Sequence, residues 1–249
     1  MFEDVHYPKH YLTEVIARID FPSPISGIEK ELPRKLTKAA MSRFPAAEPK
    51  DVVAQQFMAS RDDFSTTRTR FKQWVFHGKD REKRLTVNPD SLFVVYNAYE
   101  SYEALKKDFL GFASTFFEEY EEIQASRLGL RYVNNITMED GNPLAWEDFI
   151  DKRMLCQFEF PPDPKLLARS FHNLELSYDD FNLRYQFGMP NPDYPAAIRR
   201  KLFVLDLDAY YQGPLDYGDV SSSLDAFHDC IQVLFERAIT NKLKELMNA

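Results

Sequence analysis

One pattern of residues occurs twice along the chain and restricts its fold more than any other feature. Leu92-Phe93-Val94-Val95 leads to Ala98-Tyr99, and Leu202-Phe203-Val204-Leu205 leads to Ala209-Tyr210. Each copy is followed by a stretch with the apolar spacing of an amphipathic helix. Short segments rich in β-branched and aromatic residues precede each copy, as is typical of strands. The pattern therefore predicts two similar units, each combining a sheet with a long helix.

Alternating three- and four-residue spacings predict a helix over about residues 101–123 and a second helix from Ser222 nearly to the C-terminus. Ser101 is expected to cap the first helix, and Ser222 with Asp225 to form a capping box on the second. The charged face of the first helix, which includes Asp108, is expected to be solvated. The apolar stripes comprise Tyr102, Leu105, Phe109, Phe112, Phe116, Tyr120 and Ile123 in the first helix, and Leu224, Phe227, Ile231, Leu234 and Ala238 in the second.

Strands are predicted at corresponding places in the two halves. A strand opens each half, and three more precede each long helix. The spacing of Ile28, Leu32, Leu36 and Ala40 predicts a helix after the first strand, opened or bent by Pro33, and a shorter segment, 144–155, takes its place in the second half. The predicted strands are 12–21, 71–77, 84–87 and 92–99, then 128–136, 171–176, 183–187 and 202–210.

The sequence thus predicts an α+β protein built by tandem duplication of a β-α-β-β-β(-β)-α unit. Residues 1–125 form the first unit and residues 126–249 the second, and almost no linker separates them, so we expect one globule. In each unit a long helix covers a curved antiparallel sheet. This order resembles the saddle-like fold of the TATA-binding-protein type and, less closely, the helix-grip folds.

Composition and net charge limit the range of functions that the sequence predicts. Asp and Glu number 39 against 31 Lys and Arg, so the net charge of -8 gives no long-range attraction to nucleic acid. With 8 glycines and no phosphate-loop, dinucleotide, zincin or nucleophile-elbow motif, the chain is expected to use no cofactor. Cys156 and Cys230 are too far apart for a C-x-x-C site and are expected to be reduced and buried. The N-terminus resembles no signal peptide, so we expect a cytoplasmic protein without membrane contact.

Asp206 and Asp208 lie two residues apart on a predicted strand, so both carboxylates point to one face. Such a pair can hold a divalent metal for phosphodiester hydrolysis. Phe203, Leu205 and Leu207 take the other face, and the plainer interpretation is a strand with one wet side. None of the 5 histidines stands at metal-ligand spacing beside them, so no metal site is assigned.

Residues 61–84 form the one locally basic stretch, with aromatic residues interleaved. Arg68, Arg70, Lys72 and Trp74 are its candidate binding residues, since basic side chains hold phosphates while aromatic rings stack on bases. Against this, Trp74 and Phe76 alternate on one side of a strand, as core residues beneath a helix would.

Arg127 and Arg131 project to one face of their strand with Gly129 between them. The glycine is expected to leave a bare patch of backbone between two guanidinium groups, a notch that can accept a carboxylate or a phosphate. Asn134 completes this candidate binding site. The alternative is that both arginines pair with acidic side chains of a neighbouring element.

Several of these segments resemble a sporadically distributed prokaryotic protein family that has no assigned activity. The resemblance rests on a Y-P-x3-L-x-E-V opening at Tyr7, on Tyr99-x-x-Tyr102-Glu103, and on the R-x-G-L-R-Y-x-N string from Arg127 to Asn134. Such a patchy distribution implies a CRISPR-associated or antiviral-defence accessory role. The resemblance supplies no catalytic residue.

We therefore expect a non-catalytic binding or scaffold protein that acts through a macromolecular partner, most plausibly a protein. A metal-dependent nuclease or phosphoesterase that uses Asp206 and Asp208 is one alternative. A nucleic-acid-binding protein that uses the 61–84 surface is the other. The sequence does not predict an oligomeric state.

Overall fold

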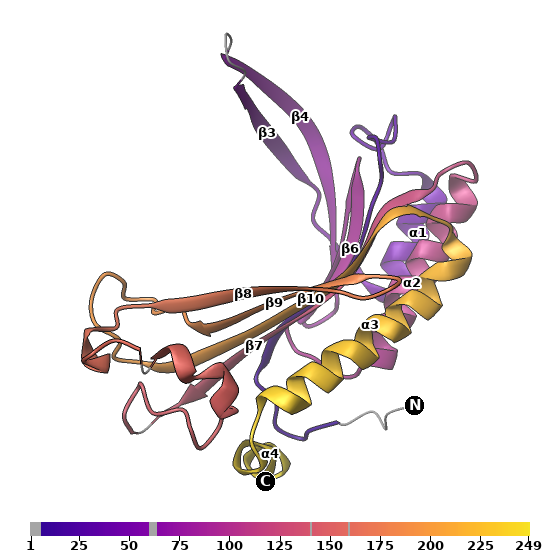
Figure 1. Cartoon of the computed structure of the whole chain (residues 1–249). Coiled ribbons are helices and arrows are strands. Elements are labelled where there is room, and N and C mark those ends of the chain that lie inside the picture. The colour runs from indigo at the N-terminus through magenta and orange to yellow at the C-terminus, as the bar shows by residue number, and fades with distance from the viewer. Residues whose placement is uncertain (1–5, 60–63, 140, 159) are drawn as a thin grey trace.

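The computed structural model describes residues 6–59, 64–139, 141–158 and 160–249, with the side chains of 54–59 and 64–69 left out of the description. The described chain has the α+β architecture that the sequence predicts (Figure 1). The first half contains β1 (Leu12–Asp20), α1 (Arg34–Arg43), β2 (Ala46–Ala47), β3 (Lys50–Ala59), β4 (Phe64–His77), β5 (Lys83–Asn88), β6 (Ser91–Tyr96) and α2 (Tyr102–Glu119). The second contains β7 (Ala125–Met138), short 3-10 turns, β8 (Ser170–Ser177), β9 (Asn182–Met189), β10 (Lys201–Leu215), α3 (Tyr217–Ala238) and α4 (Asn241–Asn248).

The strands form one ten-stranded antiparallel sheet. Its order is β2-β4-β5-β6-β1-β7-β10-β9-β8, and β3 pairs with β4. At the centre β1 pairs with β7, with Ala17 opposite Leu130 and Ile19 opposite Leu128. Outward from this pair the order is β1-β6-β5-β4 on one side and β7-β10-β9-β8 on the other. The two halves therefore contribute their strands in the same order to one continuous sheet.

Helices α1, α2 and α3 lie along one face of the sheet (Figure 1). The β3/β4 hairpin and the strands β8–β10 extend from the centre of the sheet in different directions. Because side chains alternate along a strand, each strand gives one set of residues to each face. The residues facing the helices, such as Ala17, Leu130 and Leu205, are completely or almost completely buried. Their neighbours Arg18, Arg131 and Asp206 face the opposite side, which we call the open face.

Helix α2 confirms the aromatic stripe and the cap expected at its start. The Ser101 hydroxyl accepts a hydrogen bond from the Ala104 N–H at 3.1 Å. Phe109, Phe112 and Phe116 are all buried between the helix and the sheet. The helix ends at Glu119, earlier than predicted, although Ile123 still packs against the core.

The expectation that Asp108 is solvated is wrong. Helix α1 packs beside α2 and covers the flank that carries Asp108, and the carboxylate is buried there. It accepts hydrogen bonds from Lys83 Nζ at 2.5 Å, Tyr96 OH at 2.6 Å and Arg43 Nη1 at 2.9 Å. Asp108 thus ties α2 to β5, β6 and α1.

The prediction for the C-terminal helix is wrong at both ends. Helix α3 begins at Tyr217, not at Ser222, and Asp225 accepts bonds from Tyr102 OH and Lys106 Nζ instead of capping. The helix also stops at Ala238, because Ile239 pairs as a β-bridge with Ile150. Thr240 then caps the separate helix α4.

Three further differences concern extended segments and the cysteines. Strand β4 begins at Phe64, before the predicted 71, and pairs with β3, which the sequence reasoning missed. Residues 144–155 form turns around the buried Trp146 where the first half has a helix.

Both cysteines are free thiols, but Cys156 is exposed and Cys230 only half-buried, so the expectation that both are buried is wrong.

Replacing Asp108 with Asn should destabilise the fold in a pH-dependent way. Burial raises the pKa of Asp108, but the hydrogen bonds from Lys83, Tyr96 and Arg43 outweigh it and hold the pKa below its usual 3.8. Since the folded pKa lies below the unfolded one, the charged carboxylate contributes stability above pH 3.8, and this contribution is lost as the pH falls below that value. At neutral pH we expect Asp108→Asn to lower the free energy of unfolding by about 2–4 kcal/mol.

Urea unfolding of both proteins at a series of pH values measures this difference. It should shrink as the pH falls below about 4. Asp148→Asn is the matched control, because Asp148 is exposed and its bond to Lys242 lies in solvent, so it should change stability far less. An equal effect of the two substitutions would contradict the buried role of Asp108.

Candidate functional site

The open face contains a hollow of about 380 Å³ at the centre of the sheet, which we call the open-face hollow. Strands β1, β5, β6, β7 and β10 all contribute to it. Four arginines and two aspartates stand around an apolar floor, and Glu14 and Asp206 beside them pair with Arg84 and Arg131, so each arginine has a carboxylate neighbour. The lining residues are Ile16, Arg18, Asp20, Arg84, Phe93, Val95, Arg127, Gly129, Arg131 and Asp208.

Both predicted arginines of this face are paired with the aspartates of β10. Arg131 donates two hydrogen bonds to Asp206, from Nε at 2.7 Å and from Nη2 at 2.5 Å. Arg127 donates from Nη2 to Asp208 at 3.1 Å and lies 3.7 Å from Asp20. The antiparallel register places Asp208 opposite Arg131, so each arginine reaches its partner along the neighbouring strand. Pairing with a neighbouring element is therefore what the structure shows, and ligand binding by the two arginines remains a prediction.

The expected bare notch at Gly129 is not present. The Arg127 guanidinium lies across the glycine, and a Cβ added there would stand 2.6 Å from Arg127 Nη1. The absence of a side chain at 129 therefore gives Arg127 a path to Asp208. It does not leave backbone open to a ligand.

Asp206 and Asp208 do share one face, as their spacing predicts, but each is engaged by an arginine. Burial raises the pKa of Asp208, while Arg127, Arg131 and Arg184 act in the opposite direction. Within the described residues, no group of three or more His, Cys, Asp or Glu side chains could hold a metal ion. Nothing in that part of the chain supplies the pair with a third ligand for metal-dependent hydrolysis.

The residues of the basic stretch 61–84 separate in the structure. Trp74 faces the helix side, where its indole N–H donates to the Ile28 carbonyl at 2.8 Å, and Lys72 Nζ lies 5.3 Å from the centre of its ring. Arg70 and Lys72 line a shallow hollow with Glu29 and Asp51. The side chain of Arg68 is outside the described residues.

The basic end of that stretch is occupied by acidic partners. Arg81 pairs with Glu48, Lys83 bonds to Asp108, and Arg84 lies 3.7 Å from Glu14. The interleaved pattern therefore gives no continuous basic and aromatic surface among the described side chains, and ligand binding by Arg70 or Lys72 remains a prediction.

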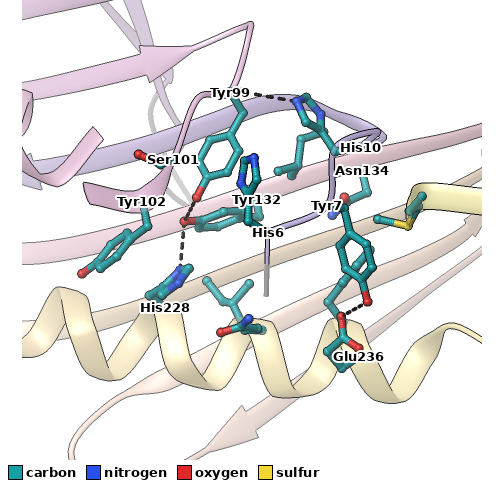
Figure 2. A pocket seen from close by; sticks show the side chains of 15 residues that line it. His6, Tyr7, His10, Tyr99, Ser101, Tyr102, Tyr132, Asn134, His228 and Glu236 are labelled. Carbon is teal, nitrogen blue, oxygen red and sulfur yellow. Dashed lines mark hydrogen bonds between the residues drawn. The ribbon is translucent and has the colours of Figure 1, made fainter. Parts of the chain in front are cut away.

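Asn134 does not join Arg127 and Arg131. It points to the helix-covered face, because its position on β7 has the opposite parity to theirs, and it is buried there. It lines a second cavity of about 80 Å³, which we call the helix-side pocket (Figure 2). Sequence reasoning missed this pocket. Its lining residues are His6, Tyr7, His10, Leu12, Tyr99, Ser101, Tyr102, Tyr132, Asn134, His228, Ile231, Gln232, Phe235, Glu236 and Met247.

A chain of aromatic hydroxyl and imidazole groups crosses the helix-side pocket. Tyr99 OH lies 3.3 Å from Tyr132 OH, which lies 3.0 Å from His228 Nδ1 (Figure 2). The His228 ring stacks on Tyr102 with centroids 4.0 Å apart. Tyr102 OH in turn donates to Asp225 at 2.7 Å. The segment before α2, strand β7 and helix α3 are thereby held together through polar side chains in an otherwise apolar layer.

The other end of the helix-side pocket is formed by the N-terminal segment. Tyr7 OH donates to Glu236 at 2.8 Å, and Lys244 Nζ lies 2.7 Å from the same carboxylate. His10 contacts the Tyr99 carbonyl through Nε2 at 3.2 Å. Its other ring nitrogen, Nδ1, is buried and has no hydrogen-bond partner within the structure described.

The sequence did contain a signal for the helix-side pocket, although spacing alone could not reveal it. Six of the residues that carry the family resemblance line this one cavity, though they come from three separate segments of the chain. They are Tyr7, Leu12, Tyr99, Tyr102, Tyr132 and Asn134.

A scan of the chain against protein-family models finds no match, and a search of the curated proteins finds none that is significantly similar. The family resemblance therefore stays a prediction. Among the described helices, none is long and apolar enough to cross a membrane.

Removing Arg131 should destabilise the fold because it leaves the buried Asp206 carboxylate unpaired. We expect Arg131→Leu to lower the free energy of unfolding by about 2–3 kcal/mol, less than for a fully buried pair because the arginine side chain is 40% exposed. The double variant Arg131→Leu/Asp206→Leu should lie closer to the wild type. Urea titration of the wild type, both single variants and the double variant gives the coupling energy. A coupling energy near zero would show that the pair does not organise this face.

Proposed function

We propose that this is a non-catalytic binding protein whose open-face hollow receives an acidic segment of a partner protein. The observation that carries the proposal is a cluster of four partly exposed arginines around an apolar floor, in a chain whose net charge is -8. Guanidinium groups bind carboxylates through paired hydrogen bonds, and an apolar floor suits the neighbouring side chains of a peptide.

Two of the four arginines are best placed to meet a partner. Arg18 is 44% exposed, pairs with Asp20 of its own strand at 2.6 Å and lies 5.5 Å from the Phe93 ring. Arg84 is about one-third exposed, and its nearest carboxylate, Glu14, is 3.7 Å away. Arg127 and Arg131 instead join β7 to Asp208 and Asp206 of β10, so moving them would break contacts between strands. We therefore assign recognition to Arg18 and Arg84, and organisation of the surface to the other pair.

A protein is favoured over nucleic acid because of the overall charge. A net charge of -8 repels a polyanion at long range, and the four arginines of the hollow, each beside a carboxylate, do not offset it. An acidic peptide segment meets a smaller penalty, since its few carboxylates lie at the arginines while the rest of the partner can carry either sign.

We include a more specific description of the fold in this proposal. We infer that the two halves arose by duplication and form a saddle of the TATA-binding-protein type, supported by the equivalent strand orders on either side of the β1–β7 pair. The family resemblance extends the proposal to an accessory role in prokaryotic antiviral defence and a cytoplasmic location. Identifying the partner protein tests the proposed defence role and the proposed location.

Affinity capture from the native host tests the proposed function. The wild type is compared with Arg18→Glu/Arg84→Glu and with the matched control Arg153→Glu/Arg200→Glu, whose arginines are exposed but lie outside the hollow. Extracts are treated with nuclease, and all variants are first shown to unfold at the wild-type urea midpoint. The captured protein is then purified and titrated against each variant.

We expect that protein to bind the wild type and the control equally, and the hollow variant at least about tenfold more weakly, with an association rate that falls with salt. Three outcomes would contradict the proposal: no specific protein is captured, the hollow variant binds as well as the wild type, or the only captured species is nucleic acid that nuclease removes.

A further inference from the structure

We propose that the helix-side pocket is a binding site for a small, uncharged, planar heteroaromatic compound about the size of a nucleobase. The pocket lies on the opposite face of the sheet from the open-face hollow, so the inference does not depend on the proposed function. Strand β7 contributes to both sites, with Arg131 on one face and Tyr132 and Asn134 on the other.

Aromatic side chains form much of the wall of the helix-side pocket. Tyr99 and Tyr132 meet edge to face with centroids 5.7 Å apart, and His10 meets Tyr99 at a similar steep angle. Phe235 adds a further half-buried ring from α3. Aromatic side chains can stack on any heteroaromatic ring, because every such ring has a π face.

Polar groups at defined places in the helix-side pocket give it hydrogen-bonding capacity. The Asn134 side chain is buried, and its Nδ2 donates a long 3.5 Å hydrogen bond to the Leu205 carbonyl. His10 Nδ1 is buried without a partner in the described chain. A buried polar atom that lacks a hydrogen bond costs free energy, so a small movement that turns His10 Nδ1 toward a ligand would recover that cost.

The charged groups around the helix-side pocket do not favour an anionic ligand. Glu236 is the one carboxylate of the lining, and Tyr7 and Lys244 both bond to it. Burial and the bond to Glu236 raise the pKa of Tyr7, and burial and Asp225 raise the pKa of Tyr102, so both phenols stay protonated. The lining contains no lysine or arginine, so a phosphate or carboxylate would meet no permanently charged cation there.

The size of the helix-side pocket limits the ligand. Its volume of about 80 Å³ exceeds the ~10–15 Å³ that one water molecule needs, so it admits several waters or one small ring system. It is far below the several hundred Å³ typical of drug-sized sites. A free base therefore fits the pocket better than a nucleotide does.

Isothermal titration calorimetry of the full chain tests the assignment. The probes are adenine, hypoxanthine, cytosine and uracil, with adenosine 5′-monophosphate and choline as charged comparators. We expect at least one base to bind with a Kd below about 1 mM, and adenosine 5′-monophosphate to bind at least about tenfold more weakly than adenine.

Two variants locate the binding. Tyr132→Phe keeps the ring but removes the hydroxyl that lies between Tyr99 and His228, and Phe235→Leu removes one aromatic wall; each should weaken the base about tenfold. Tyr194→Phe removes an exposed phenol outside the pocket and should bind as the wild type does. Urea midpoints confirm that the variants are folded.

The assignment is overturned if none of the bases binds, if the monophosphate binds more tightly than adenine, or if choline is preferred, which would indicate an ammonium site. It is also overturned if both pocket variants keep the wild-type affinity.

Discussion

The antiparallel pairing of β1 with β7 is the interaction on which the rest of the structure depends. It joins the first strand of each half, so that two sets of strands become one sheet. Its register also fixes which residues face the helices. A slip of one residue would exchange the two faces of β7, moving Leu128 and Leu130 into solvent and Arg127 and Arg131 into the core. The apolar layer under α2 and α3 therefore specifies the register, and the register places both candidate sites.

The same alternation explains how one short string serves two sites. Arg131 contributes to the open-face hollow, and Tyr132, the next residue, contributes to the helix-side pocket. Neither site can be built by a single element, because the hollow needs five adjacent strands and the pocket needs the N-terminal segment, the sheet and the C-terminal helices. Pairing of the buried carboxylates Asp108 and Asp206 with basic side chains keeps these elements in place at defined points.

The sequence predicted those features that depend on periodicity along one element. The aromatic stripe of α2, the alternation of Phe203, Leu205 and Leu207 with Asp206, and the α+β class are all local patterns that burial then enforces. It could not predict contacts that depend on how elements meet. Asp108 is buried because α1 lies against α2, and Gly129 is covered because Arg127 crosses it toward β10. Neither neighbour can be inferred from spacing within a single segment.

Native-state hydrogen exchange in increasing urea tests most directly whether the β1–β7 pair makes the two halves one cooperative sheet. If it does, the amides of β5 and β6 in the first half and of β9 and β10 in the second should converge on the same opening free energy as those of β1 and β7, all exchanging through global unfolding. Opening of β9 and β10 at a distinctly lower free energy, while β4, β5 and β6 stay protected, would contradict this account and show two units that unfold independently.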